Sequence, residues 1–539
     1  MSKKLLKSTA IVSAMTLISR VSGLVRDVVM ASVLGSSGVA DAFFVAFKIP
    51  NFLRRIFGEG AFASAFVPVF SELTEQNTYQ AKQFVNATAG ILAMVTLVLA
   101  VLGIVFAPAI VSLYAPGYKD DPVQMAYTVD ALRFMFPYLF CISLVAMSGG
   151  ILNTLNRFAI PAVTPVLLNL CLILAMWLLV PLVETASRAL AIGVLIAGVI
   201  QLLFQLPSLH REGYLPKFSL NTSTPGVGKV FSLMLPAVFS VSVAQINTFV
   251  NTVFLSGLMT GSVSWLYYSD RLMEFPVGVF GIALASVVLP SLSKENTSGT
   301  DASFSAMVDW ALRWVTLIAV PATFALYLLA TPLLSTIFQR NAFNANDVAM
   351  ASLSLEAFAI GVCAFIFVKV LASGFFAKQD TKTPMRIAVI AVLVNIVLSI
   401  LLVDSMQHTG LALAVSVAAW VNASLLFILL MVRGIYHPQS GWFWFLVRIA
   451  LAVSAMSAML LFLNEPPVVW HAWSLAQRIG HLLLLVGLGA VSYFAVLLLL
   501  GIRPKQLLLG SRAAKSVDAG SGDTGPGDAG SGDAGSGGA

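Results

Sequence analysis

Apolar segments long enough to cross a bilayer follow one another along almost the whole chain. Windows of about 20 residues, the length of helix that spans a hydrocarbon layer of roughly 30 Å, are mostly apolar and are separated by short polar joints. Hydrophobic residues make up 58% of the chain and charged residues only 10%, which excludes soluble, secreted disulfide-rich and disordered proteins. The apolar runs are continuous rather than alternating, which argues against an outer-membrane barrel. The sequence predicts an all-α polytopic membrane protein.

We predict fourteen transmembrane helices and place both termini in the cytoplasm. In the joints and near the segment ends, most lysines and arginines fall on the side shared by the N-terminus, the even-numbered joints and the C-terminus. Four fall on the other side: Lys119, Arg188, Arg340 and Arg478. The positive-inside rule makes the richer side cytoplasmic. The segments cover residues 8–35, 40–72, 84–113, 125–150, 158–182, 186–208, 226–258, 262–293, 305–338, 347–377, 384–404, 408–433, 441–464 and 473–500.

An internal repeat divides the chain into two halves. The stretch "GAFASAFVPVFSE" at 60–72 is similar to "IALASVVLPSLSK" at 282–294. Six predicted helices separate the copies, so the two halves share one orientation and form pseudo-symmetric six-helix lobes around a central cleft. The predicted domains are an N-terminal lobe at 1–208, a cytoplasmic linker at 209–225, a C-terminal lobe at 226–433, two further helices with a basic cytoplasmic end at 434–515, and a disordered Gly, Ser and Asp tail at 516–539.

Ten basic residues lie seven or more residues inside the ends of the predicted segments, where each charge costs about 2.5 to 3.5 kcal/mol unless it faces protein or water. An acid one helical turn away would neutralise such a charge locally. Four have one: Arg55 with Glu59, Arg133 with Asp130, Arg271 with Glu274 and Arg313 with Asp309. Six have none: Arg20, Arg26, Lys48, Arg54, Lys369 and Arg448. We expect Arg448 to reach the headgroups, whereas Lys369 is either unpaired or paired with a distant acid such as Glu356.

The unpaired charges concentrate in the first two segments and predict an anion site. Arg20, Arg26 and Arg54 lie there together with Lys48. Guanidinium groups bind phosphate oxygens in pairs and stay protonated, and a lysine adds a point charge. We therefore predict that these side chains bind a phosphate-containing ligand at membrane depth.

The same segments carry features that suit a cavity wall. Ser19, Gly23 and Arg26 share one stripe of a helix, which makes a narrow polar face. Pro50 removes a backbone hydrogen bond, so we expect the second segment to break there, beside Lys48. Irregular backbone at membrane depth is tolerated only where it lines protein or a cavity.

Motifs for catalysis or metal binding are missing from the sequence. Gly228 and Lys229 are followed by Val230 rather than Ser or Thr, so no phosphate-binding loop of the ATPase type exists, and no HExxH motif occurs. The three cysteines all lie in apolar segments, which suggests neither disulfides nor a metal site. We predict no enzyme activity, no metal, no cofactor and no nucleic-acid partner.

Three stretches resemble the MurJ (MviN) family of lipid II flippases. They are "SRVSGLVRD" at 19–27, "DAFFVAFKIPNFLRRIFGEGAFASAFVPVFSE" at 41–72 and "SVSWLYYSDRLMEFPVGVFGIALASVVLPSLSK" at 262–294, and the resemblance extends over about residues 4–510. Kinship with the multidrug/oligosaccharidyl-lipid/polysaccharide exporter superfamily implies two lobes that rock by alternating access. The family moves undecaprenyl-pyrophosphate-linked disaccharide pentapeptide from the cytoplasmic to the periplasmic leaflet of the bacterial inner membrane for peptidoglycan synthesis. Its partners are this lipid and the bilayer, and other cell-wall synthesis proteins are candidates.

The resemblance also implies roles for individual residues. With the charge pattern, it assigns substrate binding to Ser19, Arg20, Arg26, Lys48, Arg54 and Arg271. It assigns gating or supporting roles to Asp41, Arg55, Glu59 and Glu274, with acids latching against basic residues when substrate is absent, and we predict supporting roles for Asp270 and Lys369 as well. The membrane potential or an ion gradient is the expected driving force. Some relatives bind sodium through a carboxylate on helix 7, where this chain has Gln245 and Asn247, which argues against a sodium site of that kind.

Two other classes compete with this interpretation. A cation-coupled exporter of small molecules on the same fold would expose acids in its cleft, whereas basic residues outnumber acids in the first two segments. A membrane ligase acting on the same lipid would need a large periplasmic loop, and the predicted outward joints are shorter than about 15 residues, close to ordinary loop lengths.

Overall fold

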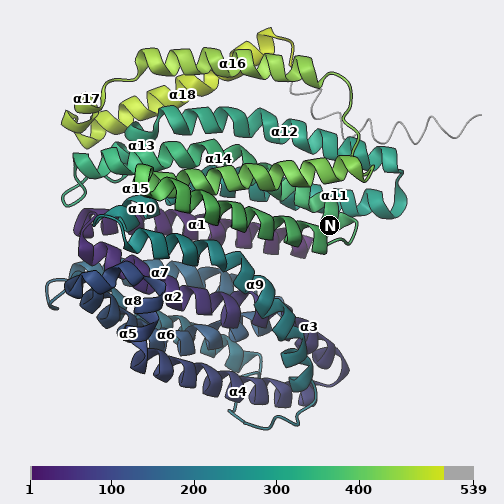
Figure 1. The fold of residues 1–539 in the computed structure, drawn as a ribbon. Helices are drawn as coiled ribbons and strands as arrows, with labels where there is room; N and C mark the ends of the chain where they lie inside the picture. Colours follow the sequence, from purple (N-terminus) through teal and green to yellow (C-terminus); the bar gives the residue numbers. More distant parts are fainter. Residues whose placement is uncertain (1–2, 503–539) are drawn as a thin grey trace, which may run out of the picture.

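The computed structural model describes residues 3–502 and shows a bundle of long helices (Figure 1). Side chains are described from residue 14 onward, except at 58–59, 239–240, 243–244, 282–283, 285–286 and 298. The predicted tail at 516–539 lies outside these residues. No β-strand occurs between residues 3 and 502, where one isolated bridge joins Arg340 and Phe343. The all-α prediction is confirmed.

The first half of the chain forms helices whose starts are set by polar capping residues. Ser37, Asn77, Asp121 and Thr185 each accept a hydrogen bond from a backbone N–H in the first turn of the helix that follows. The elements are α1 (Lys3–Leu34), α2 (Gly38–Arg54), the π-helix η1 (Arg55–Glu59), α3 (Ala61–Gln76), α4 (Thr78–Val105), α5 (Ala107–Tyr114), the 3₁₀-helix η2 (Pro116–Asp120), α6 (Pro122–Thr154), α7 (Ala159–Leu178) and α8 (Ala186–Arg211).

The second half begins with α9, after an extended connection. Thr300, Asn344 and Ser474 cap helices in the same way, each in a reciprocal capping box. The elements are α9 (Val227–Ser256), α10 (Ser262–Pro276), the π-helix η3 (Val277–Gly281), α11 (Ile282–Ser298), α12 (Asp301–Leu328), α13 (Ala330–Ile337), α14 (Ala345–Ala377), α15 (Lys382–Val432), α16 (Trp442–Leu463), α17 (Pro467–Ala472) and α18 (Leu475–Leu499).

Each predicted segment falls on one α-helix, on two consecutive α-helices or, at 384–404 and 408–433, on one part of α15. Ten helices in the described part of the chain are long and apolar enough to cross a membrane. The exact number of fourteen stays a prediction. The segments predicted at 384–404 and 408–433 form the single element α15, but the backbone at Gln407 leaves the helical region, with φ 51° and ψ −136°, between the two segments.

The internal repeat has a structural counterpart. The π-helix η1 at Arg55–Glu59 lies directly before the first copy, and η3 at Val277–Gly281 lies directly before the second, 222 residues further along at both bounds. The predicted break at Pro50 is wrong, because α2 continues through Pro50 to Arg54 and the irregular backbone begins one turn later. A proline lacks one donor, but a glycine-containing π-turn rearranges several consecutive hydrogen bonds.

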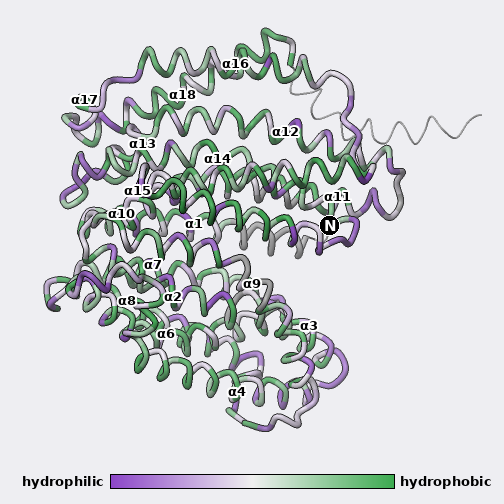
Figure 2. Tube along the Cα trace, in the orientation of Figure 1, coloured by the Kyte–Doolittle hydropathy of each residue, from purple (hydrophilic) through white to green (hydrophobic). Residues whose placement is uncertain are grey.

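The helices pack as two groups (Figure 1). In the first group α1 packs on α7, and α6 contacts α2, α4 and α8; in the second group α14 contacts α10, α12 and α15. Helix α9 packs against α3 of the first group and α15 of the second, while α16 and α18 pair at the outer edge beside α12. Figure 2 shows apolar residues along the helices and hydrophilic residues gathered in the connections at the two ends of the bundle. The predicted domain boundaries themselves stay a prediction.

One end of the bundle, which we call the Asp41 end, is closed by contacts between the groups. Oδ2 of Asp41 accepts a hydrogen bond from the backbone N–H of Gly261 at 2.7 Å, and Oδ1 accepts from the N–H of Ser264 at 2.9 Å. The hydroxyl of Ser36, just after α1, donates to Asp347 in the first turn of α14. The starts of α2, α10 and α14 are thereby held together.

Candidate functional site

A cavity of about 1150 Å³ lies between the two helix groups, away from the Asp41 end. Its wall extends to Asn153 and Phe158, at the connection between α6 and α7. The stripe predicted on the first helix lines it, with Ser19, Gly23 and Arg26. The charged residues in the wall are Arg20, Arg26, Asp27, Arg54, Arg271, Glu274 and Lys369.

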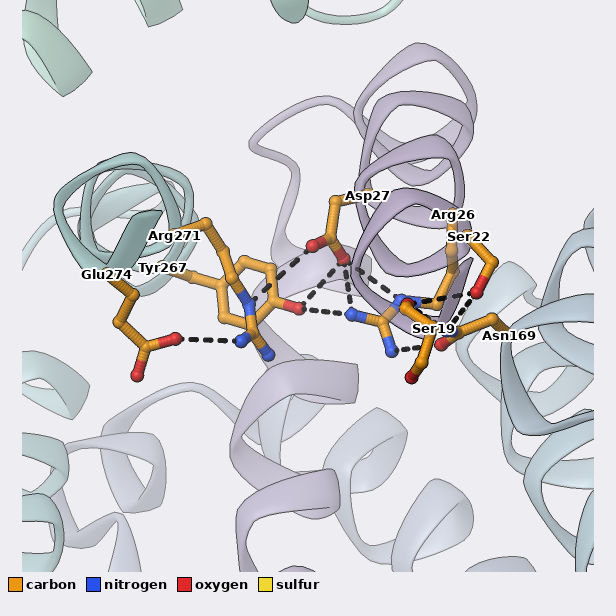
Figure 3. A network of polar contacts seen from close by, with 8 residues as sticks. All are labelled: Ser19, Ser22, Arg26, Asp27, Asn169, Tyr267, Arg271 and Glu274. Atoms are coloured by element: carbon orange, nitrogen blue, oxygen red, sulfur yellow. Dashed lines mark hydrogen bonds and ion pairs between the residues drawn. The ribbon is translucent and has the colours of Figure 1, made fainter. Parts of the chain in front are cut away.

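Arg26 is fully paired at the cavity wall (Figure 3). Its Nε and Nη2 donate to Oδ1 of Asp27 at 3.0 and 2.6 Å, and its Nη1 donates to Oδ1 of Asn169 at 3.0 Å. Only 8% of the residue is exposed. The prediction that Arg26 lacks a partner is therefore wrong. Residues i and i+1 point to different sides of a helix, but a long guanidinium side chain can bend back to a neighbouring carboxylate.

Asp27 also joins the two helix groups. Its Oδ2 lies 3.6 Å from Nε of Arg271, and its Oδ1 accepts a hydrogen bond from the Tyr267 hydroxyl at 3.0 Å. The Arg271 guanidinium lies over the Tyr267 ring at 5.0 Å. Its Nη1 also donates to Glu274 at 3.1 Å, which confirms the predicted local pair. One carboxylate on α1 therefore holds arginines from α1 and α10 beside the same cavity (Figure 3).

The other basic residues of the wall are more open. Arg20 is exposed to the cavity, and it has no hydrogen bond or ion pair with another described residue. Its guanidinium lies against Gly278 of η3, and the Lys369 side chain lies against Gly281 of the same π-turn. Arg54 donates through Nε and Nη2 to Oδ1 of Asn51 at 2.9 and 2.7 Å. Arg20 and Lys369 thus both line the cavity, and each packs against a glycine of the π-helix η3, where no side chain keeps them away from the backbone.

Several predicted site residues lie outside the cavity wall. Lys48 donates through Nζ to the Thr252 hydroxyl of α9 at 3.1 Å. Asp41 contacts the N-terminus of α10 rather than a basic side chain. Asp270 and Arg55 do not line the cavity, and the side chain of Glu59 lies outside the described residues.

Of two other predicted ion pairs within one helix, the structure confirms one and contradicts the other. Arg313 donates to Oδ2 of Asp309 at 2.7 Å, as predicted. The pair of Arg133 with Asp130 is wrong, because Asp130 binds Arg188 of α8 at 2.7 Å instead.

Sequence reasoning missed three residues that organise the site. Asp27 directly follows Arg26, so the rule that pairs charges three or four positions apart on a helix does not identify it as a partner. Asn169 of α7 donates through Nδ2 to the carbonyl oxygen of Ser19 at 3.3 Å and so fixes its own orientation toward Arg26. Tyr267 precedes the predicted Asp270 and Arg271 by one helical turn, which is the only signal that could have found it.

The region around Gln245 and Asn247, considered above for sodium, lies on α9 and contains carboxamides. Nδ2 of Asn395 on α15 lies 3.2 Å from Oδ1 of Asn247 and 3.3 Å from Oδ1 of Asn251 on α9. Among the described residues no group of three or more His, Cys, Asp or Glu side chains suits a metal ion. The expectation that this chain lacks a sodium site of the carboxylate type stays a prediction.

A bundle of membrane-length helices in two groups, with a large charged cavity between them that is closed at one end, defines a polytopic membrane transporter. The family model described as lipid II flippase MurJ matches residues 30–480. The chain belongs to this family. Membership confirms the predicted resemblance and the prediction that the chain is a transporter rather than an enzyme.

The similarity covers nearly the whole chain. A probable lipid II flippase MurJ of Vibrio cholerae is 44% identical over 514 residues, covering 94% of this chain and 98% of the relative. A lipid II flippase MurJ of Burkholderia cenocepacia is 40% identical over 506 residues, covering 93% and 98%. A solved structure of lipid II flippase MurJ in an inward closed conformation matches with a TM-score of 0.76 at 26% identity, covering 90% of this chain and 98% of the other.

More distant structures share the fold alone. An inward-facing multidrug transporter of the MATE family, in the MOP superfamily, matches with a TM-score of 0.64 at 15% identity and covers 79% of this chain and 98% of the other. Its substrate class therefore says nothing about the cavity of this chain.

Proposed function

We propose that this protein flips lipid II, the undecaprenyl-pyrophosphate-linked disaccharide pentapeptide, from the cytoplasmic to the periplasmic leaflet of the bacterial inner membrane. The relatives named above are a probable lipid II flippase and a lipid II flippase, and this chain matches almost the whole length of each. The other partner is the bilayer itself, and further cell-wall synthesis proteins are candidate partners.

The observation that carries this proposal is the meeting of Arg26 and Arg271 at Asp27 on the cavity wall. The two arginines come from different helix groups, so an anion bound between them contacts both. A diphosphate carries about two negative charges and accepts several paired hydrogen bonds from guanidinium groups, whereas Asp27 offers one charge. We infer that Asp27 occupies the arginines while the cavity is empty and that the diphosphate displaces it.

Arg20, Arg54 and Lys369 complete the cationic wall in this mechanism. Arg20 is the most available of them, because it is exposed and lies beside the Gly278 turn. The lipid tail remains outside the cavity, between helices and in contact with the bilayer. Glu274 stays paired with Arg271 and keeps that guanidinium turned toward the cavity.

The orientation follows from the distribution of basic residues. The positive-inside rule places the N-terminus and the connections after α3, α6, α8 and α11 in the cytoplasm, which makes the Asp41 end periplasmic. In that orientation the cavity faces the cytoplasm and the periplasmic end is closed, as a state ready to load substrate requires. Asp41 and Asp347 then act as a periplasmic latch, through backbone and hydroxyl donors rather than basic residues.

When the bound diphosphate neutralises the positive charge of the cavity wall, the two helix groups can close on the cytoplasmic side and open on the periplasmic side. An inside-negative potential favours outward movement of anions by about 2.3 kcal/mol per charge per 100 mV, hence roughly 4.6 kcal/mol for two charges. No ATPase is needed on this account, and no bound cofactor is invoked.

The test is a pair of substitutions at Arg26 with transport as the readout. Arg26→Ala should abolish lipid II translocation in cells depleted of the wild-type protein while membrane levels stay normal. Arg26→Lys keeps the charge but loses the planar guanidinium that forms paired hydrogen bonds. Near-normal activity of this variant would show that paired hydrogen bonding is unimportant. Arg448→Ala on α16, away from the cavity wall, is the matched control and should complement fully. Full complementation by Arg26→Ala would overturn the proposed role.

A further inference from the structure

We propose that Gln201 and Gln205 on α8 form a second subsite in the cavity, which binds hydrogen-bond donors of the substrate headgroup. The donors are sugar hydroxyls or peptide N–H groups. This inference rests on the proposed function, because it assigns a part of the same substrate to a part of the wall that carries no basic residue.

The two glutamines lie one turn apart and are held by the same residue of α7. Nε2 of Gln201 donates to the backbone carbonyl of Thr164 at 2.8 Å, and Nε2 of Gln205 donates to the Thr164 hydroxyl at 3.0 Å. A carbonyl can only accept, so the Gln201 amide group must face Thr164. The Thr164 hydroxyl donates to the carbonyl of Ile160 at 3.3 Å, which leaves it free to accept from Gln205.

These contacts turn both carboxamide oxygens away from Thr164. Neither oxygen has a hydrogen-bond partner in that position. Oε1 of Gln201 and Oε1 of Gln205 form no hydrogen bond with any described residue. The two residues are 2% and 1% exposed. Buried carbonyl oxygens are nearly always hydrogen-bonded, because an unsatisfied one loses its contact with water and gains nothing. Two unpaired acceptors one helical turn apart are therefore suited to a ligand that brings hydrogen-bond donors.

The unpaired acceptors belong to the same cavity as the arginines. Gln201, Gln205 and Thr164 all line it. Thr164 precedes Asn169, the partner of Arg26, by five residues on α7, which is a rise of about 7.5 Å along the helix. The subsite thus lies more than one turn from Arg26 toward the α6–α7 connection. A headgroup whose diphosphate is bound at the arginines would extend its next groups into this region.

Neutral acceptors without nearby carboxylates select uncharged donors. A cation is disfavoured by Arg20 and Arg26 in the same cavity, and an anion finds no donor because both Nε2 groups are occupied. Both oxygens are covered by neighbouring atoms. The ligand therefore reaches them as those neighbours move aside, while the Nε2 groups stay bonded to Thr164.

The experiment compares lipids with and without the headgroup. Purified protein in nanodiscs is titrated with lipid II and with undecaprenyl pyrophosphate, using wild type, Gln201→Met and Gln205→Met. Each substitution should weaken lipid II binding about three- to tenfold, the loss of one hydrogen bond, and leave undecaprenyl pyrophosphate binding unchanged. Thr96→Val is the matched control, because its buried hydroxyl bonds only to its own helix α4, outside the cavity wall, and it should change neither affinity.

A further lipid separates the two sources of donors. With the pyrophosphate-linked disaccharide that lacks the peptide, a persisting loss in the glutamine variants assigns the subsite to sugar hydroxyls. Disappearance of the loss assigns it to peptide N–H groups. Either result supports a donor subsite.

Thermal unfolding of the ligand-free variants guards against a purely structural role. Each substitution removes one unsatisfied buried acceptor and one Nε2 hydrogen bond to Thr164, two effects of opposite sign, so the unfolding temperature should change little. Unaltered lipid II affinity in both variants, or an equal loss for lipid II and undecaprenyl pyrophosphate, would overturn the subsite. Failure of the proposed function looks different, because the wild type itself would then bind neither lipid.

Discussion

Oδ2 of Asp27 on α1 lies 3.6 Å from Nε of Arg271 on α10, and this ion pair joins the two helix groups at the wall of the cavity. The Asp27 side chain is only 4% exposed. The Nε atom of Arg271 has no hydrogen-bond partner, so the distance leaves one donor of the guanidinium unused. A ligand with more negative charge than a single carboxylate can therefore compete for Arg271 and for Arg26 together.

Asp27→Asn should bind pyrophosphate lipid more tightly and flip it more slowly. Removing one like charge about 4 Å from the bound anion is worth about 1 kcal/mol or more, or at least about fivefold in affinity. Turnover should fall, because nothing then displaces the anion from the arginines. The measurement is lipid II affinity of the purified variant beside its transport in vesicles. Weaker binding would show that Asp27 organises the arginines rather than competing with the substrate.

Gly278→Ala should impair transport through Arg20 without unfolding the protein. A Cβ at Gly278 would overlap the Arg20 guanidinium, the mobile end of a flexible side chain, so the arginine moves and the fold does not. We expect about a tenfold loss of transport, the scale of one misplaced charge–phosphate contact. Gly480→Ala on α18 is the control, because no atom lies near its added Cβ. Wild-type transport by Gly278→Ala would show that the position of Arg20 is unimportant.

Asp41→Asn should loosen the Asp41 end. Its carboxylate accepts from the backbone N–H groups of Gly261 and Ser264 at the start of α10, where negative charge is favoured. Losing the charge from these bonds should cost about 1.5 to 3 kcal/mol. A cysteine placed at Ala31, buried at this end, should then react faster with an impermeant thiol reagent from the periplasm in a background without native cysteines.

The control for that experiment is Asp120→Asn, at an exposed position in η2 of the same end. Its labelling rate should equal that of the parent protein. Equal labelling rates for Asp41→Asn and the parent protein would show that Asp41 does not hold the periplasmic end closed.

Asp380→Asn should destabilise the protein by the same amount at every pH from 5 to 8. Hydrogen bonds from the Thr383 hydroxyl and backbone N–H, with Arg433, hold the pKa of the Asp380 carboxyl well below its usual range. A depressed pKa means that the stabilisation is fully present above the unfolded value of about 3.9 and is lost only as the pH falls through the lower folded value. Thermal unfolding at several pH values checks this, with the exposed Asp404→Asn as control. A penalty that grew between pH 5 and 8 would contradict the assignment.

Much of the fold was predictable because its causes are local. Continuous apolar runs require helices at membrane depth, since no water is there to satisfy a bare backbone. The repeat was visible in short matching stretches, and the π-turns at Arg55–Glu59 and Val277–Gly281 fall at the same spacing. The pair of Arg313 with Asp309 was also predictable, because residues four apart on a helix are neighbours.

The site was only partly predictable because its contacts are not local. The sequence identified Arg20, Arg26, Arg54 and Arg271, and all four line one cavity. It did not reveal that Asn169 reaches Arg26 from 143 residues away. It also assigned Asp130 to Arg133, although Arg188 of another helix takes that acid.

The sequence by itself determined that the chain forms membrane helices and that basic residues gather at membrane depth in its first two segments. These properties depend on hydrophobicity and on spacing along one helix. Only the tertiary structure decided which charges are neutralised and which stay open, with Arg26 paired at Asp27 and Arg20 facing the cavity. Electrostatic and hydrogen-bond energies depend on distances of a few ångströms between different helices, and those distances exist only once the helices have packed.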